Sequence, residues 1–322
     1  MPCMTPILGA LALLLVLAGC SSAPAPAEQS PPAATASFPI TVQHALGSTT
    51  IPQQPTRVYT LGPSDADAVL ALGVTPVGIH SRYGFDRGVG PWAEQELGTA
   101  SPTVTGGREL SLEAIAAAKP DLIINVASGG EQAEYDTLSR IAPTVALPAG
   151  AQPYSPRWQD ATRLIAQALG KQAEGDKLVA DTETYLEGVA ADNPTFAGKT
   201  ATYLDVMAGE VYVGGKEATV VTTLRELGFV NTPYVESLPA SQTQVPLSAE
   251  LLPQIDSDVL LVYGFGSNQQ ETLASNAGLA NLGAVQARHA YFLPDLALSA
   301  PSVLSIPYGL DAMLPFLKAA TG

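Results

Sequence analysis

A long stretch with helical periodicity and no strand signal divides the chain into two halves. It runs from about residue 156 to residue 191, and its apolar residues recur at intervals of three and four, which places them on one face of a helix. They are Trp158, Ala161, Leu164, Ile165, Ala168, Leu169, Leu178, Tyr185, Leu186 and Val189. Gly170 can interrupt this helix. A helix of this length can join two lobes, provided that each half forms a core of its own.

Both halves alternate short apolar runs with helical segments. A hairpin is expected at 38–42 and 48–52, before the alternation begins. Further strands are expected at 57–61, 76–79, 122–126, 200–206, 259–263 and 291–293. Helices are expected at 65–72 (capped by Ser64 and ended by Gly73), 112–118, 131–141, 218–227, 250–255 and 310–320, the last interrupted by Pro315. Strand–helix alternation is typical of parallel, right-handed α/β sheets.

An internal repeat relates the two halves. Ser111-Leu112-Glu113 lies ten residues before Asp121, and Ser248-Ala249-Glu250 lies ten residues before Asp258. In both copies a serine is expected to cap a short helix, with the glutamate in its first turn and the aspartate before an apolar strand. Leu-Gly pairs at 72–73 and 227–228 are a second similarity between the two halves. The two halves are therefore expected to fold alike.

The start of the chain is an apolar run, residues 7–16, followed by Leu-Ala-Gly and Cys20. About ten residues are too few to span a bilayer and are typical of a signal-peptide core. With its cysteine the segment is similar to a bacterial lipoprotein signal, which implies cleavage before Cys20 and lipidation of that residue. No Lys or Arg precedes it, so the usual positive start is missing. Residues 21–37, rich in Ala, Pro and Ser, predict a disordered tether.

The charge of the chain excludes several partners. The net charge is −15, and none of it lies in residues 1–19. Nucleic acid is disfavoured because its affinity depends on Lys and Arg contacts. A polybasic membrane patch is disfavoured on the same ground. The cysteines, at positions 3 and 20, leave the mature chain without a disulfide.

The two-lobe plan resembles a known family. The segments 56–61, 69–78, 111–115, 119–123 and 298–304 are similar to those of the helical-backbone class (class III) of ABC-transporter substrate-binding proteins, a branch that serves iron-siderophores, haem and cobalamin. Lys-Pro-Asp-Leu-Ile at 119–123 is the most specific of them, and the resemblance covers roughly 38–316. Residues 90–93 and the Ala-rich helix are most similar to the iron-siderophore branch of high-GC Gram-positive bacteria.

The resemblance implies a fold class and domain limits. The class is α/β, with two similar Rossmann-like lobes whose parallel-rich sheets are joined by a single long α-helix, and a ligand cleft lies between the lobes. The signal peptide is expected at 1–19, the lipidated cysteine and tether at 20–37, and the first lobe at 38–155. The linking helix is expected at 156–192 and the second lobe at 193–322.

Candidate ligand contacts follow from where open α/β sheets bind. Ligands sit beyond the carboxyl ends of the strands, which nominates the loops at 62–64, 80–83, 127–130, 207–209 and 264–266. An iron-siderophore complex needs flat apolar walls and a few cations, and an arginine can both stack and donate. The residues expected to contact the ligand are Arg82, Tyr83, Trp92, Arg108, Tyr212, Tyr263 and Phe265. Arg87 is expected in solvent instead.

Two interpretations fit Glu113 and Glu250. In the resembling family a glutamate on each lobe docks on arginines of the membrane permease, and the repeat places these two at matching positions. The simpler reading is a carboxylate that stabilises the first turn of a helix.

Other functions compete with this one. Bare-metal capture is disfavoured because the three histidines, His44, His80 and His289, lie in separate segments. Haem or another tetrapyrrole stays open, since His80 falls on a cleft loop and tyrosines can ligate iron. Gly-x-Ser-x-Gly and His-Glu-x-x-His motifs are absent from the sequence, which argues against an enzyme such as a lipid-anchored hydrolase. A cell-wall scaffold is the remaining alternative.

The sequence therefore predicts a monomeric, non-enzymatic receptor, anchored by lipid at Cys20 on the outer face of the cytoplasmic membrane. It is expected to capture an Fe(III)-siderophore and to deliver it to an ABC permease. No cofactor of its own and no direct protein ligand to a metal are expected.

Overall fold

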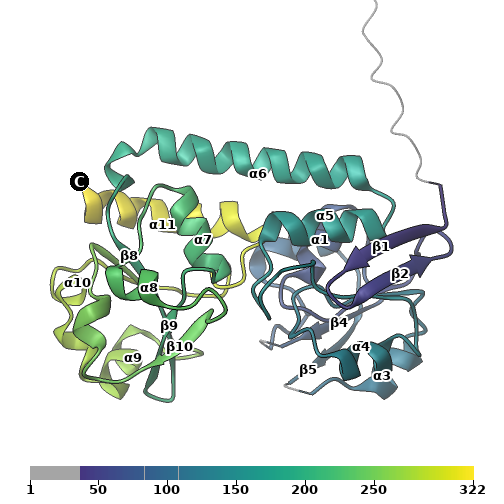
Figure 1. The fold of residues 1–322 in the computed structure, drawn as a ribbon, viewed down its shortest axis with the longest axis horizontal. Coiled ribbons are helices and arrows are strands. Elements are labelled where there is room, and N and C mark those ends of the chain that lie inside the picture. The colour runs from purple at the N-terminus through teal and green to yellow at the C-terminus, as the bar shows by residue number, and fades with distance from the viewer. Residues whose placement is uncertain (1–36, 83, 108) are drawn as a thin grey trace, which may run out of the picture. The chain divides into compact units, whose positions relative to one another are not determined.

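The computed structural model describes residues 37–82, 84–107 and 109–322. The signal segment, Cys20 and the tether up to residue 36 lie outside the described residues, so the predictions made for them stay predictions. The described chain forms two five-stranded sheets and one two-stranded hairpin (Figure 1). Among its helices, none combines the length and apolar character that a membrane span requires.

The sheet of the first lobe is entirely parallel, with strand order β5-β4-β3-β6-β7. Its strands are β3 (Val58–Thr60), β4 (Gly78–Ser81), β5 (Thr103–Gly106), β6 (Leu122–Ile124) and β7 (Thr144–Val145). β3 and β6 are buried along their whole length, as a continuous apolar run predicts for central parallel strands. The strands β3, β4 and β6 confirm the prediction; β5 and β7 were not foreseen.

Four α-helices and a hairpin complete this lobe. The hairpin pairs β1 (Ile40–His44) with β2 (Gly47–Ile51) and confirms the prediction. The helices are α1 (Asp65–Ala71), α2 (Glu94–Leu97, after the 3₁₀ turn Pro91–Ala93), α3 (Leu112–Ala117) and α4 (Gln132–Leu138). Ser64 precedes α1 as expected, but its side chain makes no capping hydrogen bond.

The sheet of the second lobe is mixed, with strand order β10-β9-β8-β11-β12. Its strands are β8 (Ala201–Met207), β9 (Glu210–Gly214), β10 (Gln244–Leu247), β11 (Val259–Tyr263) and β12 (Ala290–Phe292). β8, β11 and β12 run parallel, while β9 is antiparallel to both of its neighbours. The α-helices are α7 (Thr219–Glu226), α8 (Pro233–Ser237), α9 (Gln269–Ser275), α10 (Gly283–Gln286) and α11 (Ser305–Thr321). Three 3₁₀ turns accompany them, Pro194–Phe196 (η2), Leu252–Ile255 (η3) and Leu279–Asn281 (η4).

The loop nominated at 207–209 is a tight turn. Ala208 and Gly209 are its two central residues and join β8 to β9, with φ of 50° and 84°. Positive φ at both positions is the geometry that matches strand twist. Pro315 does not interrupt the last helix, since α11 continues through it to Thr321.

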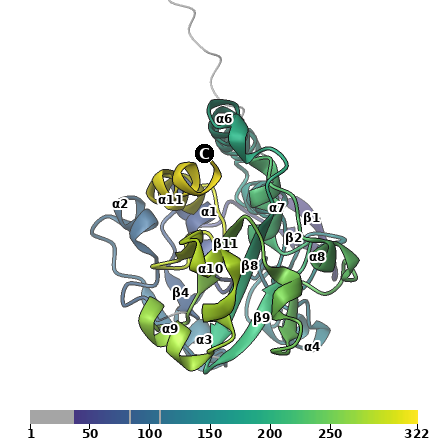
Figure 2. The same cartoon turned by 90° about the vertical axis from the view of Figure 1, so that its left-hand side faces the viewer.

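The helical stretch at 156–192 is two helices, which corrects the prediction of one. α5 (Trp158–Ala168) ends at Gly170, whose φ is 68°. Gly170 N–H donates to the carbonyl of Gln167 at 3.1 Å and Lys171 N–H donates to that of Ala166 at 2.8 Å, which is a Schellman cap. α6 (Gln172–Asp192) then runs above α5 at one end and near α7 and α11 at the other (Figures 1 and 2). α6 alone is the single long helix that joins the lobes.

The internal repeat has a structural basis. Asp121 accepts hydrogen bonds from the N–H and Oγ1 of Thr56 at 2.9 and 2.8 Å, and Asp258 accepts the same pair from Thr200 at 2.7 and 2.8 Å. Each aspartate thus ties the start of one central strand to its neighbour. Gly73 and Gly228 end the equivalent helices α1 and α7 with φ of 72° and 96°.

The serine caps of the repeat agree only in the first lobe. Ser111 caps α3, because its Oγ accepts the N–H of Ala114 at 3.3 Å. Ser248 does not cap a helix: a turn closes from its carbonyl to Leu251, and the 3₁₀ turn begins only at Leu252. Pro253, the second residue of that turn, cannot donate a backbone hydrogen bond, which favours the shorter 3₁₀ form.

Candidate ligand-binding cleft

A cleft of about 600 Å³ lies between the two lobes. All five loops nominated from the carboxyl ends of the strands contribute to it, through Pro63, Ser64, Arg82, Ala127, Met207 and Phe265. The first lobe adds residues 153–156 and the α5 residues Trp158 and Ala161. The second lobe adds Tyr203, Asp205, residues 218–220, Thr243, Gln244, Leu296 and residues 299–301. The cleft therefore joins the carboxyl edges of both sheets, as the fold class predicts.

The buried carboxylate of Asp65 holds two cleft loops of the first lobe together. Its Oδ2 accepts the N–H groups of Gly62 at 2.8 Å and of Val126 at 3.0 Å, and its Oδ1 accepts that of Ala127 at 3.0 Å. Burial raises the pKa of Asp65 to about 6, although the three N–H groups favour the ionised form. Asp65 thereby fixes the backbone that carries Pro63, Ser64 and Ala127 to the cleft.

Arg82 and Tyr154 form a stacked pair on this wall. The guanidinium carbon of Arg82 lies 4.7 Å from the centroid of the Tyr154 ring, within cation–π range. Tyr154 is 53% exposed, its φ is 56°, and its N–H donates to the carbonyl of Ser128 at 2.7 Å. A Cβ at Gly129 would lie 2.9 Å from the Tyr154 hydroxyl, so the glycine leaves room for the ring. The pair presents one cation and one aromatic ring to the cleft.

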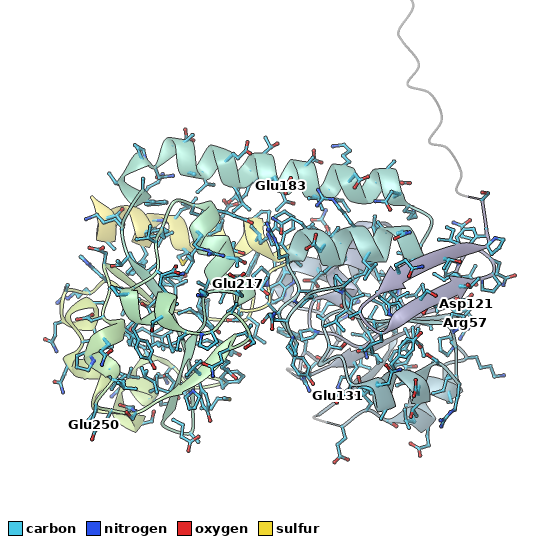
Figure 3. The ribbon with its side chains drawn as sticks, in the orientation of Figure 1. Arg57, Asp121, Glu131, Glu183, Glu217 and Glu250 are labelled. Atoms are coloured by element: carbon cyan, nitrogen blue, oxygen red, sulfur yellow. The ribbon has the colours of Figure 1, made fainter. Side chains whose placement is uncertain are left out.

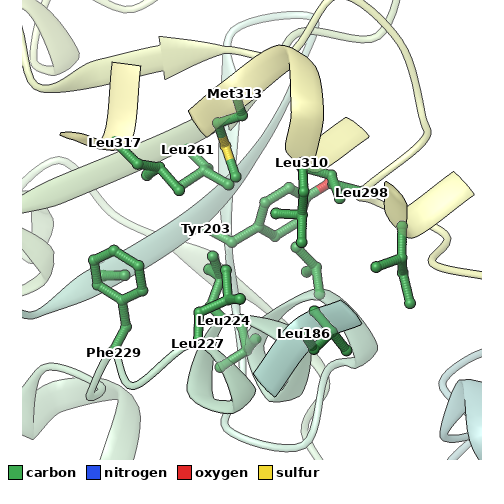
Figure 4. Close-up of a cluster of buried hydrophobic side chains, with 14 of the residues drawn as sticks. Leu186, Tyr203, Leu224, Leu227, Phe229, Leu261, Leu298, Leu310, Met313 and Leu317 are labelled. Carbon is green, nitrogen blue, oxygen red and sulfur yellow. The ribbon is translucent and has the colours of Figure 1, made fainter. Parts of the chain in front are cut away.

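The wall of the second lobe is one face of β8. Tyr203, Asp205 and Met207 line the cleft, whereas Leu204 and Val206 point to the other side and pack in a different core cluster. The ring of Tyr203 packs among leucines, as Figure 4 shows, while its hydroxyl lies 2.5 Å from Asp205 Oδ1.

Asp205 is held from two sides. Tyr203 donates to its Oδ1, and Gln244 Nε2 donates to its Oδ2 at 2.7 Å. Burial raises the pKa of Asp205, and the two hydrogen bonds oppose that rise.

Aromatic rings form much of the remaining surface. Phe265, 39% exposed, lines the cleft and contacts Tyr263 edge-on, with the ring centroids 4.7 Å apart. Trp158 lines the cleft from α5 and is almost fully buried; its Nε1 lies 3.4 Å from Glu226 of α7. Flat rings facing a wide cleft suit a bulky ligand with apolar or amide surfaces.

The structure brings some of the predicted contact residues together and separates others. Arg82 and Phe265 line the cleft, and Tyr263 lies directly behind Phe265. Tyr83 and Arg108 lie outside the described residues. Tyr212, on β9, bonds Glu210 at 2.8 Å and is not among the cleft-lining residues.

Trp92 also lies away from the described lining. Its Nε1 donates to Oδ2 of buried Asp67 at 2.7 Å, and its ring contacts Phe85 and Tyr308 at centroid distances of 5.7 and 5.8 Å. Arg87 was expected to lie free in solvent. It instead pairs with Glu94 and is half-buried.

Three cleft residues, Tyr154, Trp158 and Asp205, are not among the contacts predicted from the sequence. Tyr154 belongs to an irregular segment with no strand or helix signal. Trp158 was assigned only to the apolar stripe of a helix. Asp205 had a signal, since it is a charged residue inside an otherwise apolar strand.

Glu113 and Glu250 are both exposed. Glu113 lies in the first turn of α3, and Glu250 lies in the turn before Leu252, at the edge of the second lobe (Figure 3). They occupy matching positions in the two copies of the repeat, each eight residues before the aspartate, Asp121 or Asp258, that links two strands. Neither carboxylate has a hydrogen-bond partner among the described residues.

No group of three or more metal-ligating side chains gathers anywhere in the described chain. His80 is buried on β4 and its Nδ1 lies 3.2 Å from Thr105 Oγ1, and it does not line the cleft. His44 lies in the β1–β2 hairpin, 2.9 Å from Thr49 Oγ1.

Two α/β lobes, joined by one long helix around a cleft with aromatic walls, define a solute-binding protein. A family model described as periplasmic binding protein matches residues 58–297, more than half of the chain, and the chain belongs to this family. Its members carry ligands and do not transform them, which confirms the prediction that the protein is not an enzyme.

Individual relatives agree with this assignment. The chain is 28% identical to the probable siderophore-binding lipoprotein YfiY of Bacillus subtilis (strain 168). The alignment spans 316 residues and covers 94% of each chain. A periplasmic solute binding protein from Mycobacterium smegmatis matches with a TM-score of 0.76 and 30% identity, over 88% of this chain and 99% of that one. PiaA of Streptococcus pneumoniae, in complex with ferrichrome, matches with a TM-score of 0.75 and 29% identity, over 88% and 98% of the two chains. These matches confirm the predicted fold class.

Proposed function

We propose that this protein captures an Fe(III)-siderophore in the cleft and delivers it to an ABC importer. The observation that carries the proposal is the cleft of about 600 Å³ with the Arg82–Tyr154 pair on one wall and Phe265 on the other. Hydroxamate and catecholate oxygens suit an arginine donor, and the organic frame of a siderophore suits aromatic rings. The names of two relatives support the same ligand class: YfiY is called siderophore-binding, and PiaA was crystallised with ferrichrome.

Tryptophan fluorescence gives a direct test. The chain has two tryptophans, and Trp158 lines the cleft while Trp92 packs on Asp67. The full-length protein in detergent is titrated with an Fe(III)-hydroxamate, an Fe(III)-catecholate, haemin and cobalamin. We expect saturable quenching by an iron-siderophore that persists in Trp92→Phe and is lost in Trp158→Phe. Binding of haemin alone would replace this proposal with a tetrapyrrole receptor, and silence from all four would point to a scaffold.

The cellular setting is proposed on other grounds. Lipidation at Cys20 would hold the receptor on the outer face of the cytoplasmic membrane, and YfiY is named a lipoprotein. Cys20→Ser should move the protein from the membrane fraction to the soluble fraction. Retention in the membrane would exclude Cys20 as the anchor.

Exposed Glu113 and Glu250 are proposed to dock on the permease. The combined change Glu113→Ala with Glu250→Ala should abolish uptake of the iron chelate and leave its binding in solution unchanged. Glu187→Ala, at an exposed position of α6, is the matched control. Undiminished uptake by the double variant would remove both residues from the docking surface.

A further inference from the structure

Asp205 is a buried carboxylate on the wall of the cleft. It is 8% exposed and shares its face of β8 with Tyr203 and Met207. Its hydrogen-bond donors are a hydroxyl and an amide, both neutral. Within the described residues it has no Lys or Arg partner. A buried carboxylate without a cationic partner is costly, because desolvation penalises the charged form.

Arg82 is the only cationic side chain among the described residues that line the cleft, and Asp205 is the only acidic one. Arg82 lies on the wall of the first lobe and Asp205 on that of the second. The two are not paired with each other within the described residues. The cleft therefore has a positive wall and a negative wall, and these two side chains cancel in net charge.

We propose that Asp205 selects the ligand by accepting a hydrogen bond from a cationic or N–H group on its organic frame, so that the cleft prefers ferric chelates of zero or positive net charge. This inference rests on the proposed function. The chelate would turn an oxygen-rich side to Arg82 and a nitrogen donor to Asp205.

The hydrogen-bonding capacity of Asp205 leaves room for this contact. A carboxylate offers about four acceptor positions. Tyr203 and Gln244 occupy two of them, one on each oxygen. A bound ligand also displaces water from the cleft, which strengthens both the attraction of an ammonium group and the repulsion of a strongly anionic chelate. Burial raises the pKa of Asp205, because desolvation penalises the ionised form more than the hydrogen bonds from Tyr203 and Gln244 stabilise it.

A ligand pair that differs in one charge tests the inference. One ligand is a linear ferric trihydroxamate with a free terminal ammonium group, and the other is the same chelate with that amine acetylated. We expect acetylation to weaken binding to the unchanged protein by about tenfold, the effect of one well-placed charged hydrogen bond. In Asp205→Asn the same acetylation should change the affinity by less than about twofold. Glu187→Gln, which removes one exposed carboxylate on α6, should keep the tenfold ratio.

A second variant covers the case in which Asp205→Asn does not fold. Gln244 is exposed and already donates to Asp205 Oδ2, so Gln244→Lys places an ammonium beside the carboxylate without altering β8. This variant should also lose the preference for the free ammonium ligand. In addition, it should bind a triply anionic ferric tris-catecholate more tightly than the unchanged protein does.

The outcomes separate the inference from the function on which it rests. Equal acetylation ratios in the unchanged protein and in both variants would overturn the role of Asp205 while leaving a siderophore receptor in place. Tight binding of the tris-catecholate that neither variant improves would do the same. Failure of every ferric chelate to bind would overturn the proposed function, and the inference with it.

Discussion

Replacement of Asp67 by asparagine should make the stability of this protein less dependent on pH. Asp67 is 3% exposed, and its Oδ2 accepts the Trp92 Nε1–H at 2.7 Å and the Ser302 hydroxyl at 2.7 Å. Burial raises its pKa to about 7, and the nearby charges of Asp65 and Glu96 add to the rise. In the unfolded chain the carboxyl regains its ordinary value of 3.8.

The sign of the effect follows from that difference. The folded protein keeps the proton to higher pH, so Asp67 stabilises the fold most below about pH 4, and this contribution is lost as the pH rises through about 7. One pKa unit corresponds to about 1.36 kcal/mol, so the whole window carries about 4 kcal/mol. About 2.5 kcal/mol of it falls between pH 5 and pH 8.

Asparagine removes the charge and keeps the hydrogen bonds. Its amide oxygen can take the place of Oδ2 and accept from both Trp92 and Ser302, and its nitrogen takes the place of Oδ1, which accepts no hydrogen bond from the described residues. Urea unfolding at pH 5, 6, 7 and 8 measures the result. Between pH 5 and pH 8 the unchanged protein should lose about 2.5 kcal/mol more than Asp67→Asn does.

The control is Asp86→Asn, which removes one exposed carboxylate from the same lobe. Its free energy of unfolding should follow that of the unchanged protein across the pH range. If Asp67→Asn also runs parallel to the unchanged protein, Asp67 is not a buried acid that retains its proton, and the reasoning fails.

Two further changes probe single contacts. Asp65→Asn should destabilise the fold by about 1–3 kcal/mol and weaken ligand binding, because an amide nitrogen would face the N–H of Ala127 or of its neighbours. Urea unfolding measures the first effect and ligand titration the second. An unchanged free energy of unfolding together with an unchanged affinity would refute the role of Asp65 at the cleft. Gly175→Ala should destabilise by about 1–3 kcal/mol, since its Cβ would lie 2.2 Å from that of Ala166 where α6 crosses α5. Gly188→Ala, on the same helix with nothing within 4 Å, should stabilise by about 0.5–1 kcal/mol, and equal melting shifts for the two glycines would contradict the packing.

The central elements were predictable because their signals are local. The solid apolar run of β6 and the Ser111 cap of α3 are written in consecutive residues. β5 was not predicted because it is a largely exposed edge strand of threonines and glycine, with one valine. β9 and β10 escaped because their pairing depends on the hairpin turn at Ala208 and on partners distant in sequence.

The site was predictable as loops but not as side chains. The carboxyl ends of the strands gave the correct loops, since that edge is a property of the topology. Which side chain faces inward depends on long-range contacts. Trp92 turns to Asp67, which lies 25 residues away, and Arg87 turns to Glu94, so the aromatic and basic cluster near them did not mark the cleft. Tyr154 reaches the cleft because its backbone has a positive φ, a conformation that a tyrosine in the sequence does not predict.

The contacts between the lobes limit how far the cleft can open. Leu178 of α6 packs against the cores of both lobes, and Ser302, just before α11, bonds Asp67 of α1. Glu226 of α7 accepts a hydrogen bond from Gln159 of α5 at 2.8 Å. A wide hinge opening would have to break these buried contacts together, whereas a small rotation would not. A receptor that closes little cannot reshape itself around different ligands, which is why we propose the fixed charges of Arg82 and Asp205, one on each wall, as the determinants of which chelate binds.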